Sequence, residues 1–446
     1  MLPPIPLIAA VMVVLLSMFG TPGGADPSSA PRPTEAVLNG SAATDLNGWS
    51  ASADQGRITV ERFSGRTGAP KPTGVRLSSG GNSGSWAFAL VAIHRGFFEP
   101  GTYYRMTAYL RDLKGKGRAY GLLLANAQYQ DQPAKTTEYG RPLDTKWVQV
   151  TRTFIATGTG GADTGVYLAL PTAGSFQAEV TGVSVQRVDP PLPPRVPAGT
   201  AATTRVTFAG KAGSPPDPDI WNHETGGGGW GHGEPQIYTA STKNARLDGK
   251  GGLEITVRKD GGTYTSARLN SKGGVTVKAG SYLEVELTGP TGKGVWPAVW
   301  LIGTDVDTVG WPQSGEMDVY EASGGTPNIA RTAVHLPTAA DPTKERSYGW
   351  AEAESQTDLG EPADAAPHLY GVYFSDKLIR FYVDRKPAMT IWASDAKATG
   401  RLWPFGKSMY LVMNIAIAPN VDYSQTVFPR TMTIHAIGIW QGGIPF

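Results

Sequence analysis

The sequence contains no cysteine in its 446 residues. This absence excludes disulfide bonds, thiol nucleophiles, zinc–thiolate centres and the lipidated cysteine of a lipoprotein. It does not assign a cellular compartment, because an exported protein of this length can be stabilised by a large core alone.

Charge is also scarce, with 17% charged residues and a net charge of +2. A chain without a strong basic or acidic balance offers no electrostatic footprint for nucleic acid or for an acidic surface, so we expect neither partner. The 57 glycines and 35 prolines indicate many turns and short strands. Twelve tryptophans provide aromatic rings for stacking on sugar faces in addition to the core.

Long apolar runs are missing except at the N-terminus. Residues 1–19 carry no charged side chain, an apolar run extends from Leu7 to Met18, and small residues precede Asp26. We predict a secretory signal peptide over residues 1–25 and a disordered polar segment over residues 26–35. The alternative is an uncleaved N-terminal membrane anchor. The expected mature protein is extracellular, bacterial, monomeric and free of the membrane.

Convincing helical periodicity is absent as well, and the rest of the chain reads as strands, so we predict an all-β protein. Residues 36–188 contain roughly seven or eight short strands between turn residues, which is typical of a β-sandwich. The proline-rich residues 189–205 predict a semi-rigid linker. Residues 206–446 predict a larger sandwich of two curved sheets, with one concave face able to hold a chain-like ligand.

The start of the first sandwich, Leu38-Asn39-Gly40 followed by Asn47-Gly48-Trp49-Ser50, resembles that of jelly-roll carbohydrate-binding modules. No acid/base cluster stands out in this region. We therefore interpret residues 36–188 as a carbohydrate-binding or spacer module rather than a second enzyme.

Three carboxylates occur within six residues in Ser314-Gly315-Glu316-Met317-Asp318-Val319-Tyr320-Glu321-Ala322. On a regular strand Glu316, Asp318 and Tyr320 share one face, and Glu321 points to the other. A β-bulge would return Glu321 to the first face, and bulges are frequent beside active sites. Two glutamates leaning together could then approach the separation of about 5–5.5 Å of a retaining glycosidase pair. The alternative is a solvated face of a sheet.

Four distinctive segments follow one another along the chain. They are Trp221-Asn222-His223-Glu224-Thr225-Gly226-Gly227-Gly228-Gly229-Trp230-Gly231-His232-Gly233-Glu234, Tyr264-Thr265-Ser266-Ala267-Arg268-Leu269, Gly294-Val295-Trp296-Pro297-Ala298-Val299-Trp300-Leu301 and Trp311-Pro312-Gln313-Ser314-Gly315-Glu316-Met317-Asp318-Val319-Tyr320-Glu321. In this order they resemble glycoside hydrolase family 16, in its bacterial laminarinase-like branch. The similarity extends over about residues 206–441. It implies a jelly-roll fold and retaining endo-hydrolysis of β-glucans with 1,3 or mixed 1,3-1,4 linkages.

The resemblance implies that Glu316 is the nucleophile, Asp318 the assisting carboxylate and Glu321 the acid/base. Physical chemistry agrees with these roles, because three carboxylates on one strand cannot all ionise easily and their titrations couple. Glu321, at the end of the row, is the natural holder of a proton for the leaving oxygen. Asp318 can hydrogen-bond Glu316 during attack and departure.

The resemblance also implies a set of substrate-binding positions, namely Trp296, Trp300, Trp311, Glu234, Arg268 and His335. A tryptophan ring can lie flat against the apolar face of a glucosyl unit. The alternative for the tryptophans is burial in the core, which we favour for Trp300 and weigh evenly for the other two. His335 is expected beside the acid/base, and a structural histidine is the alternative.

Other chemistries find little support. Gly226–Gly231 satisfies G-x-G-x-x-G but has no surrounding βαβ unit, and no G-x-S-x-G elbow is present. His223 and His232 lie in a glycine-rich stretch without a carboxylate partner pattern, so a zinc site is not predicted. Val206-Thr207-Phe208 and Ile434-His435-Ala436 lack the acids that bind calcium in many relatives. We predict no metal and no cofactor.

Alternatives remain for the substrate. The segment Ile415-Ala416-Ile417-Ala418-Pro419-Asn420 lacks a Gly-Gly pair that is common in the family at this point, which leaves the linkage open. The same fold could act on another β-linked polymer such as a galactan, or transfer rather than hydrolyse. A non-catalytic glucan-binding protein is a third possibility, disfavoured because both glutamates are present.

Overall fold

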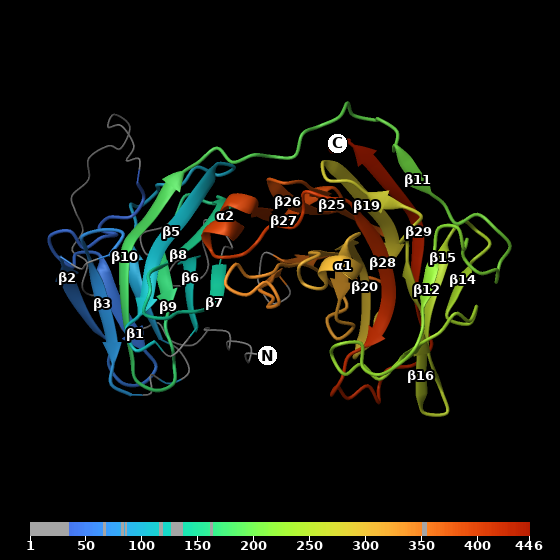
Figure 1. Cartoon of the computed structure of the whole chain (residues 1–446), viewed down its shortest axis with the longest axis horizontal. Helices are drawn as coiled ribbons and strands as arrows, with labels where there is room; N and C mark the ends of the chain where they lie inside the picture. The colour runs from blue at the N-terminus through green and yellow to red at the C-terminus, as the bar shows by residue number, and fades with distance from the viewer. Residues whose placement is uncertain are drawn as a thin grey trace. The chain divides into compact units, whose positions relative to one another are not determined.

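A computed structural model describes residues 35–65, 68–81, 84, 87–115, 119–125, 137–160, 164–349 and 355–446. The predicted signal peptide and nearly all of the polar segment that follows it lie outside these residues. No helix in the described part of the chain is long and apolar enough to cross a membrane. The chain forms two compact units, Met1–Pro190 and Pro191–Phe446 (Figure 1).

The first unit is built from two five-stranded sheets. One has the order β1-β4-β9-β6-β7, with β1 (Trp49–Ala53), β4 (Ala87–Ala92), β9 (Gly165–Ala169), β6 (Ala119–Ala125) and β7 (Thr137–Pro142). The other has the order β2-β3-β10-β5-β8, with β2 (Thr59–Ser64), β3 (Thr73–Ser79), β10 (Phe176–Arg187), β5 (Tyr103–Asp112) and β8 (Val148–Ile155). Alternate residues of β5 are buried, as expected for a strand with one face on a core.

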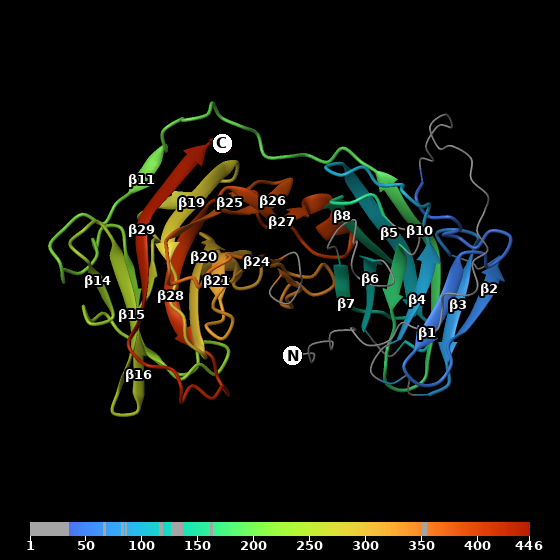
Figure 2. The same cartoon turned by 180° about the vertical axis from the view of Figure 1, so that it is seen from behind.

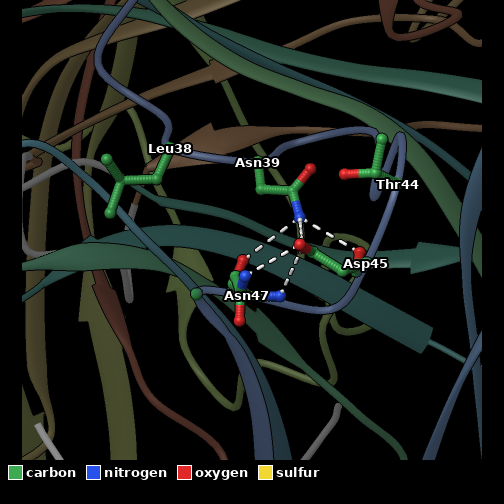
Figure 3. Close-up of a pocket in the computed structure, with 6 residues that line it drawn as sticks. Leu38, Asn39, Thr44, Asp45 and Asn47 are labelled. Carbon is green, nitrogen blue, oxygen red and sulfur yellow. Dashed lines mark hydrogen bonds between the residues drawn. The ribbon is translucent and has the colours of Figure 1, made fainter.

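The motif at the start of this unit closes a loop before β1 (Figure 3). The Asn39 side-chain amide donates to Asp45 Oδ1 and to the Asn47 carbonyl, at 3.1 and 3.2 Å. Asn47 in turn donates to both Asp45 carboxylate oxygens, and the Trp49 indole donates to the Asn39 carbonyl. These side chains form hydrogen bonds within the loop, so their local role is to stabilise its conformation.

The second unit is a sandwich of a ten-stranded and a nine-stranded sheet. The ten-stranded sheet has the order β13-β16-β15-β29-β19-β25-β26-β27, and β11 and β14 pair with β29 and β15. Its strands are β11 (Thr204–Val206), β13 (Ile237–Tyr238), β14 (Ala245–Leu247), β15 (Leu253–Asp260), β16 (Thr263–Ser266), β19 (Ser281–Thr288), β25 (His368–Phe374), β26 (Leu378–Val383), β27 (Lys386–Trp392) and β29 (Arg430–Gln441).

The nine-stranded sheet has the order β12-β17-β28-β20-β21-β22-β23, and β18 and β24 pair with β28 and β22. Its strands are β12 (Asn222–Glu224), β17 (Arg268–Asn270), β18 (Thr276–Val277), β20 (Val295–Gly303), β21 (Glu316–Ala322), β22 (Ile329–His335), β23 (Tyr348–Gly349), β24 (Gln356–Asp358) and β28 (Met409–Ile417). The helices are short, α1 (Val306–Val309) and α2 (Ala393–Ala398). The predicted all-β class is confirmed.

The main core of this unit lies between the two sheets, which appear as two layers in Figure 2. It includes Leu283 and Val285 of β19 and Val299 and Leu301 of β20, all without solvent exposure. The opposite face of the nine-stranded sheet carries a separate small cluster that contains Ala298, Trp300, Ile302, Tyr410 and Val412. This second face is the one on which the polar residues below gather.

Candidate active site

A register shift in β21 confirms the predicted bulge. Ala298 pairs with Glu321, whereas Trp300 pairs with Asp318, and β22 shows the same interruption between Asp318 and Glu321. Val319 and Tyr320 both pack into the main core. The extra residue therefore lets Glu321 share the face of Glu316 and Asp318. The alternation that would have placed Tyr320 on that face is wrong, because the bulge sends two consecutive side chains inward.

Separate tryptophans donate to the two glutamates. The indole Nε1 of Trp296, on β20, lies 2.5 Å from Glu321 Oε1. The indole Nε1 of Trp311, in the segment before β21, lies 3.0 Å from Glu316 Oε2. Trp311 is 46% exposed, so nearly half of its surface remains open to a ligand. Each indole N–H favours the ionised form of its carboxylate.

The three carboxylates of β21 are in unequal environments. Burial raises the pKa of Glu316 to about 7, with the positive charge of His335 opposing this and the charge of Asp318 adding to it. Burial raises the pKa of Glu321 further, to about 8, and the Asp318 charge adds to it against the Trp296 hydrogen bond. The two glutamates titrate as a coupled group in which Glu321 keeps its proton to higher pH.

His335 ends β22 and connects three acids. Its Nε2 lies 3.0 Å from Asp318 Oδ2 and 3.7 Å from Glu316 Oε1, and its Nδ1 lies 2.5 Å from Glu345 Oε1. Burial alone lowers the pKa of His335, but the Glu316 charge and the hydrogen bonds to Asp318 and Glu345 raise it well above its ordinary value. His335 therefore carries a positive charge at neutral pH.

Arg268, on β17, is held between two indole rings. Its guanidinium carbon lies 4.7 Å from the centre of the Trp300 ring and 5.0 Å from that of Trp230. Glu224, opposite Arg268 on β12, accepts from its Nε at 2.7 Å. Trp300 is buried, as expected, but it lies on the site face, where its Nε1 donates to Asn414 Oδ1 at 2.9 Å.

Glu234 lies at the end of the glycine-rich segment and is buried. Burial raises its pKa, against the hydrogen bond from Gln236 and the charges of His232 and Arg268. Gln236 also accepts from the backbone N–H of Ile417, which ties this segment to β28. Charge interactions with Arg268 and His232 thus connect Glu234 to the same region as β21.

Metal binding is the remaining chemistry to weigh. Among the described residues, Glu316, Asp318 and His335 form a group whose donor atoms lie within 4.8 Å of one another. Both imidazole nitrogens of His335 already face carboxylate oxygens at hydrogen-bond distance. A protonated imidazole accounts for this arrangement without a cation, because each ring N–H has an acceptor.

Several residues at this face are not among the sequence-based candidates. Glu224 accepts a hydrogen bond from Arg268, and the Trp230 ring stacks against its guanidinium. Asn414 accepts a hydrogen bond from the Trp300 indole, and Glu345 lies at hydrogen-bond distance from His335. Glu224 and Trp230 lie inside a segment that carried the family resemblance, so their proximity to the site was detectable. Glu345 lies in an irregular segment between β22 and β23, and no periodic pattern marks it.

Comparisons with known proteins identify relatives of the second unit. The family model described as "Glycosyl hydrolases family 16" matches residues 234–443. A protein named beta-glucanase from Rhodothermus marinus is 32% identical over 242 residues, covering 51% of this chain and 80% of that protein. A glucan endo-1,3-beta-glucosidase A1 from Niallia circulans is 30% identical over 252 residues, covering 50% of this chain and 36% of that protein.

Among solved structures, a laminarinase from Flavobacterium sp. UMI-01 matches with 31% identity and a TM-score of 0.46, covering 54% of this chain and all of that one. The β-sandwich, its carboxylate-bearing strand and the sequence relatives define a glycoside hydrolase. The chain belongs to glycosyl hydrolase family 16.

Proposed function

We propose that the chain is an endo-acting β-glucanase that hydrolyses internal β-1,3 or mixed β-1,3-1,4 bonds with retention of configuration. In this proposal Glu316 is the nucleophile, Asp318 assists it, and Glu321 is the acid/base. The observation that carries the proposal is the bulge between Asp318 and Glu321, which brings two differently titrating glutamates to one face. The names of the two relatives described above support a β-glucan substrate.

The chemistry follows a double displacement. The Glu316 carboxylate attacks the anomeric carbon while Glu321 donates its proton to the departing glycosidic oxygen, which leaves a glycosyl ester on Glu316. Glu321, now ionised, removes a proton from water, whose oxygen attacks the anomeric carbon and releases Glu316. The imidazolium of His335 and the indole N–H of Trp311 stabilise the Glu316 charge before attack and after release.

The substrate is tested with a panel of polysaccharides. A linear β-1,3-glucan, a mixed-linkage β-1,3-1,4-glucan and a β-1,3-galactan are incubated with the full chain. We expect both glucans to shorten rapidly by size-exclusion chromatography, as internal cleavage requires, and the first reducing ends to be β-anomers by proton NMR. Early α-anomers contradict retention, and preferential cleavage of the galactan contradicts the glucan assignment.

The pH dependence of kcat/KM provides a separate prediction. Glu316 must be ionised and Glu321 protonated, so the acid limb reports the lower apparent pKa, about 7, and the alkaline limb the higher, about 8. Trp311→Phe removes the donor to Glu316, raises its pKa and moves the acid limb to higher pH. Trp296→Phe does the same to Glu321 and moves the alkaline limb to higher pH.

Each phenylalanine variant is the control for the other, because both remove an indole N–H and keep an aromatic ring. We expect a limb shift of up to about one pH unit in each. Initial rates over a buffered pH series measure it. If Trp311→Phe moved only the alkaline limb, the roles of the two glutamates would be reversed.

The remaining sequence predictions stay proposals. We propose that residues 36–188 form an accessory carbohydrate-binding sandwich, residues 189–205 a linker and residues 206–446 the catalytic domain. Support comes from the two-sheet architecture of the first unit. Secretion is proposed from the apolar residues at the N-terminus.

A further inference from the structure

Glu345 lies outside the three-carboxylate strand but joins it through one side chain. Its Oε1 lies 2.5 Å from His335 Nδ1, on the side of the imidazole opposite Asp318. Asp318 is 7% exposed and Glu345 30% exposed at the side chain. The row Glu345–His335–Asp318 therefore runs from the partly open edge of the site to its buried strand.

The backbone holds Glu345 in place. The segment after β22 folds back on itself, with the Thr338 N–H donating to the Lys344 carbonyl and the Arg346 N–H to the Leu336 carbonyl. The Arg346 side chain also donates to the Thr399 carbonyl, at 3.2 Å. A carboxylate presented from a paired hairpin is fixed relative to the strand that carries His335, unlike a long exposed side chain in a surface ion pair.

The charges around the imidazole show what this carboxylate does. Glu316 and Asp318 face His335 from β21, and Glu321, on the same strand, interacts with the charge of His335. The charge of Arg268, on β17, lowers the pKa of Glu316, and the charge of His232, in the glycine-rich segment, lowers that of Glu345. Burial alone raises the pKa of Glu345, but its contacts with His335 lower it, so Glu345 is ionised when His335 is charged.

We propose that Glu345 is a positioning residue, which acts through His335 to keep a protonated imidazole between the Glu316 and Asp318 carboxylates. This inference rests on the proposed role of Glu316. When both ring nitrogens donate, Nδ1–H to Glu345 and Nε2–H to Asp318, the ring orientation is fixed. With a neutral imidazole, Glu316 loses the positive charge that lowers its pKa, so more of Glu316 is protonated, and a protonated carboxyl cannot attack.

The test uses Glu345→Gln, which keeps the size and an acceptor oxygen but removes the charge. Asp341→Asn is the matched control, since it removes a charge from the turn of the same hairpin. There Asp341 accepts hydrogen bonds from the backbone N–H and the hydroxyl of Thr343. The imidazole NMR signals of His335 are followed against pH without substrate. We expect its titration to move down by about one unit in Glu345→Gln and to stay unchanged in the control.

Kinetics on the β-1,3-glucan complete the test. In Glu345→Gln we expect kcat/KM at neutral pH to fall about tenfold through kcat, with KM retained and the acid limb moved to higher pH. Glu345→Asp, which keeps the charge, should restore a profile closer to that of the native chain. An unchanged His335 titration, or lower activity with an unmoved acid limb, overturns the proposal. Failure of the native chain to cleave glucan would contradict the proposed function but leave the His335 titration interpretable.

Discussion

Replacing Glu316 with glutamine is expected to lower kcat on β-1,3-glucan by about 10⁴-fold or more while leaving oligosaccharide binding nearly intact. The amide keeps the shape of the side chain and can still accept from Trp311, but it cannot form the glycosyl ester that double displacement requires. Initial rates of reducing-end release and isothermal titration with a glucan oligosaccharide measure the two quantities. Glu254→Gln is the control, because Glu254 lies on β15 and pairs with the exposed Arg246.

A second variant makes the role of Glu316 visible in the product. In Glu316→Ala, azide can occupy the vacated space and attack the anomeric carbon of an activated aryl β-glycoside directly. The phenolate departs, the configuration inverts, and the product is an α-glycosyl azide. Proton NMR distinguishes this product from its β-anomer. Near-native turnover in Glu316→Gln would contradict the assignment of the nucleophile.

The same substitution has a consequence for stability. The folded-state pKa of Glu316 lies above its ordinary value, so the unfolded chain ionises first as the pH rises. The folded state therefore loses stability across the interval between the two values, and this loss persists above the upper one. Glu316→Gln removes the group, and its Tm at alkaline pH should equal or exceed that of the native chain. An active site that destabilises its own fold is consistent with a functional rather than a structural carboxylate.

The fold class was predictable because strand alternation and turn residues are local signals. The alternation of buried and exposed residues in β5 and the continuously buried β28 correspond to a one-sided and a two-sided strand environment. The bulge in β21 was predictable from chemistry rather than from propensity, since only an extra residue lets Glu321 join Glu316. The face of Tyr320 was predicted wrongly, because a bulge turns one neighbouring side chain to the other face and the alternation rule does not say which one.

The resemblance indicated which segments lie near the site, but the specific side-chain pairs that tertiary structure brings together were not predictable. Glu224 and Arg268 are 44 positions apart in the chain, and only the pairing of β12 with β17 places them opposite each other. Glu345 is ten positions beyond His335, and the return of an irregular hairpin brings it back. For Trp300 we favoured burial in the core over a substrate-binding role, and the side chain is buried. However, Trp300 lies in the small cluster on the second face of the nine-stranded sheet, under the Arg268 guanidinium, and not in the main core.

Replacing Glu321 with alanine is expected to impair the two chemical steps unequally. Cleavage of a polysaccharide bond needs a proton on a poor leaving group, so kcat on β-1,3-glucan should fall by about 10³-fold or more. In an aryl β-glycoside made from an acidic phenol, the phenolate departs without that proton. Formation of the glycosyl ester from this substrate should therefore remain fast. Hydrolysis of the glycosyl ester then becomes limiting because no base activates water, and KM for the aryl substrate should fall as the intermediate accumulates.

Azide separates this role from that of Glu316. In Glu321→Ala the anion needs no general base and attacks the glycosyl ester on Glu316, which inverts the anomeric centre a second time and gives a β-glycosyl azide. We expect azide to accelerate turnover of the aryl substrate and the product to have the β configuration by proton NMR. Because Glu316→Ala is expected to give the α product, the two variants form a matched pair. An α product from Glu321→Ala, or no effect of azide, would show that Glu321 is not the acid/base.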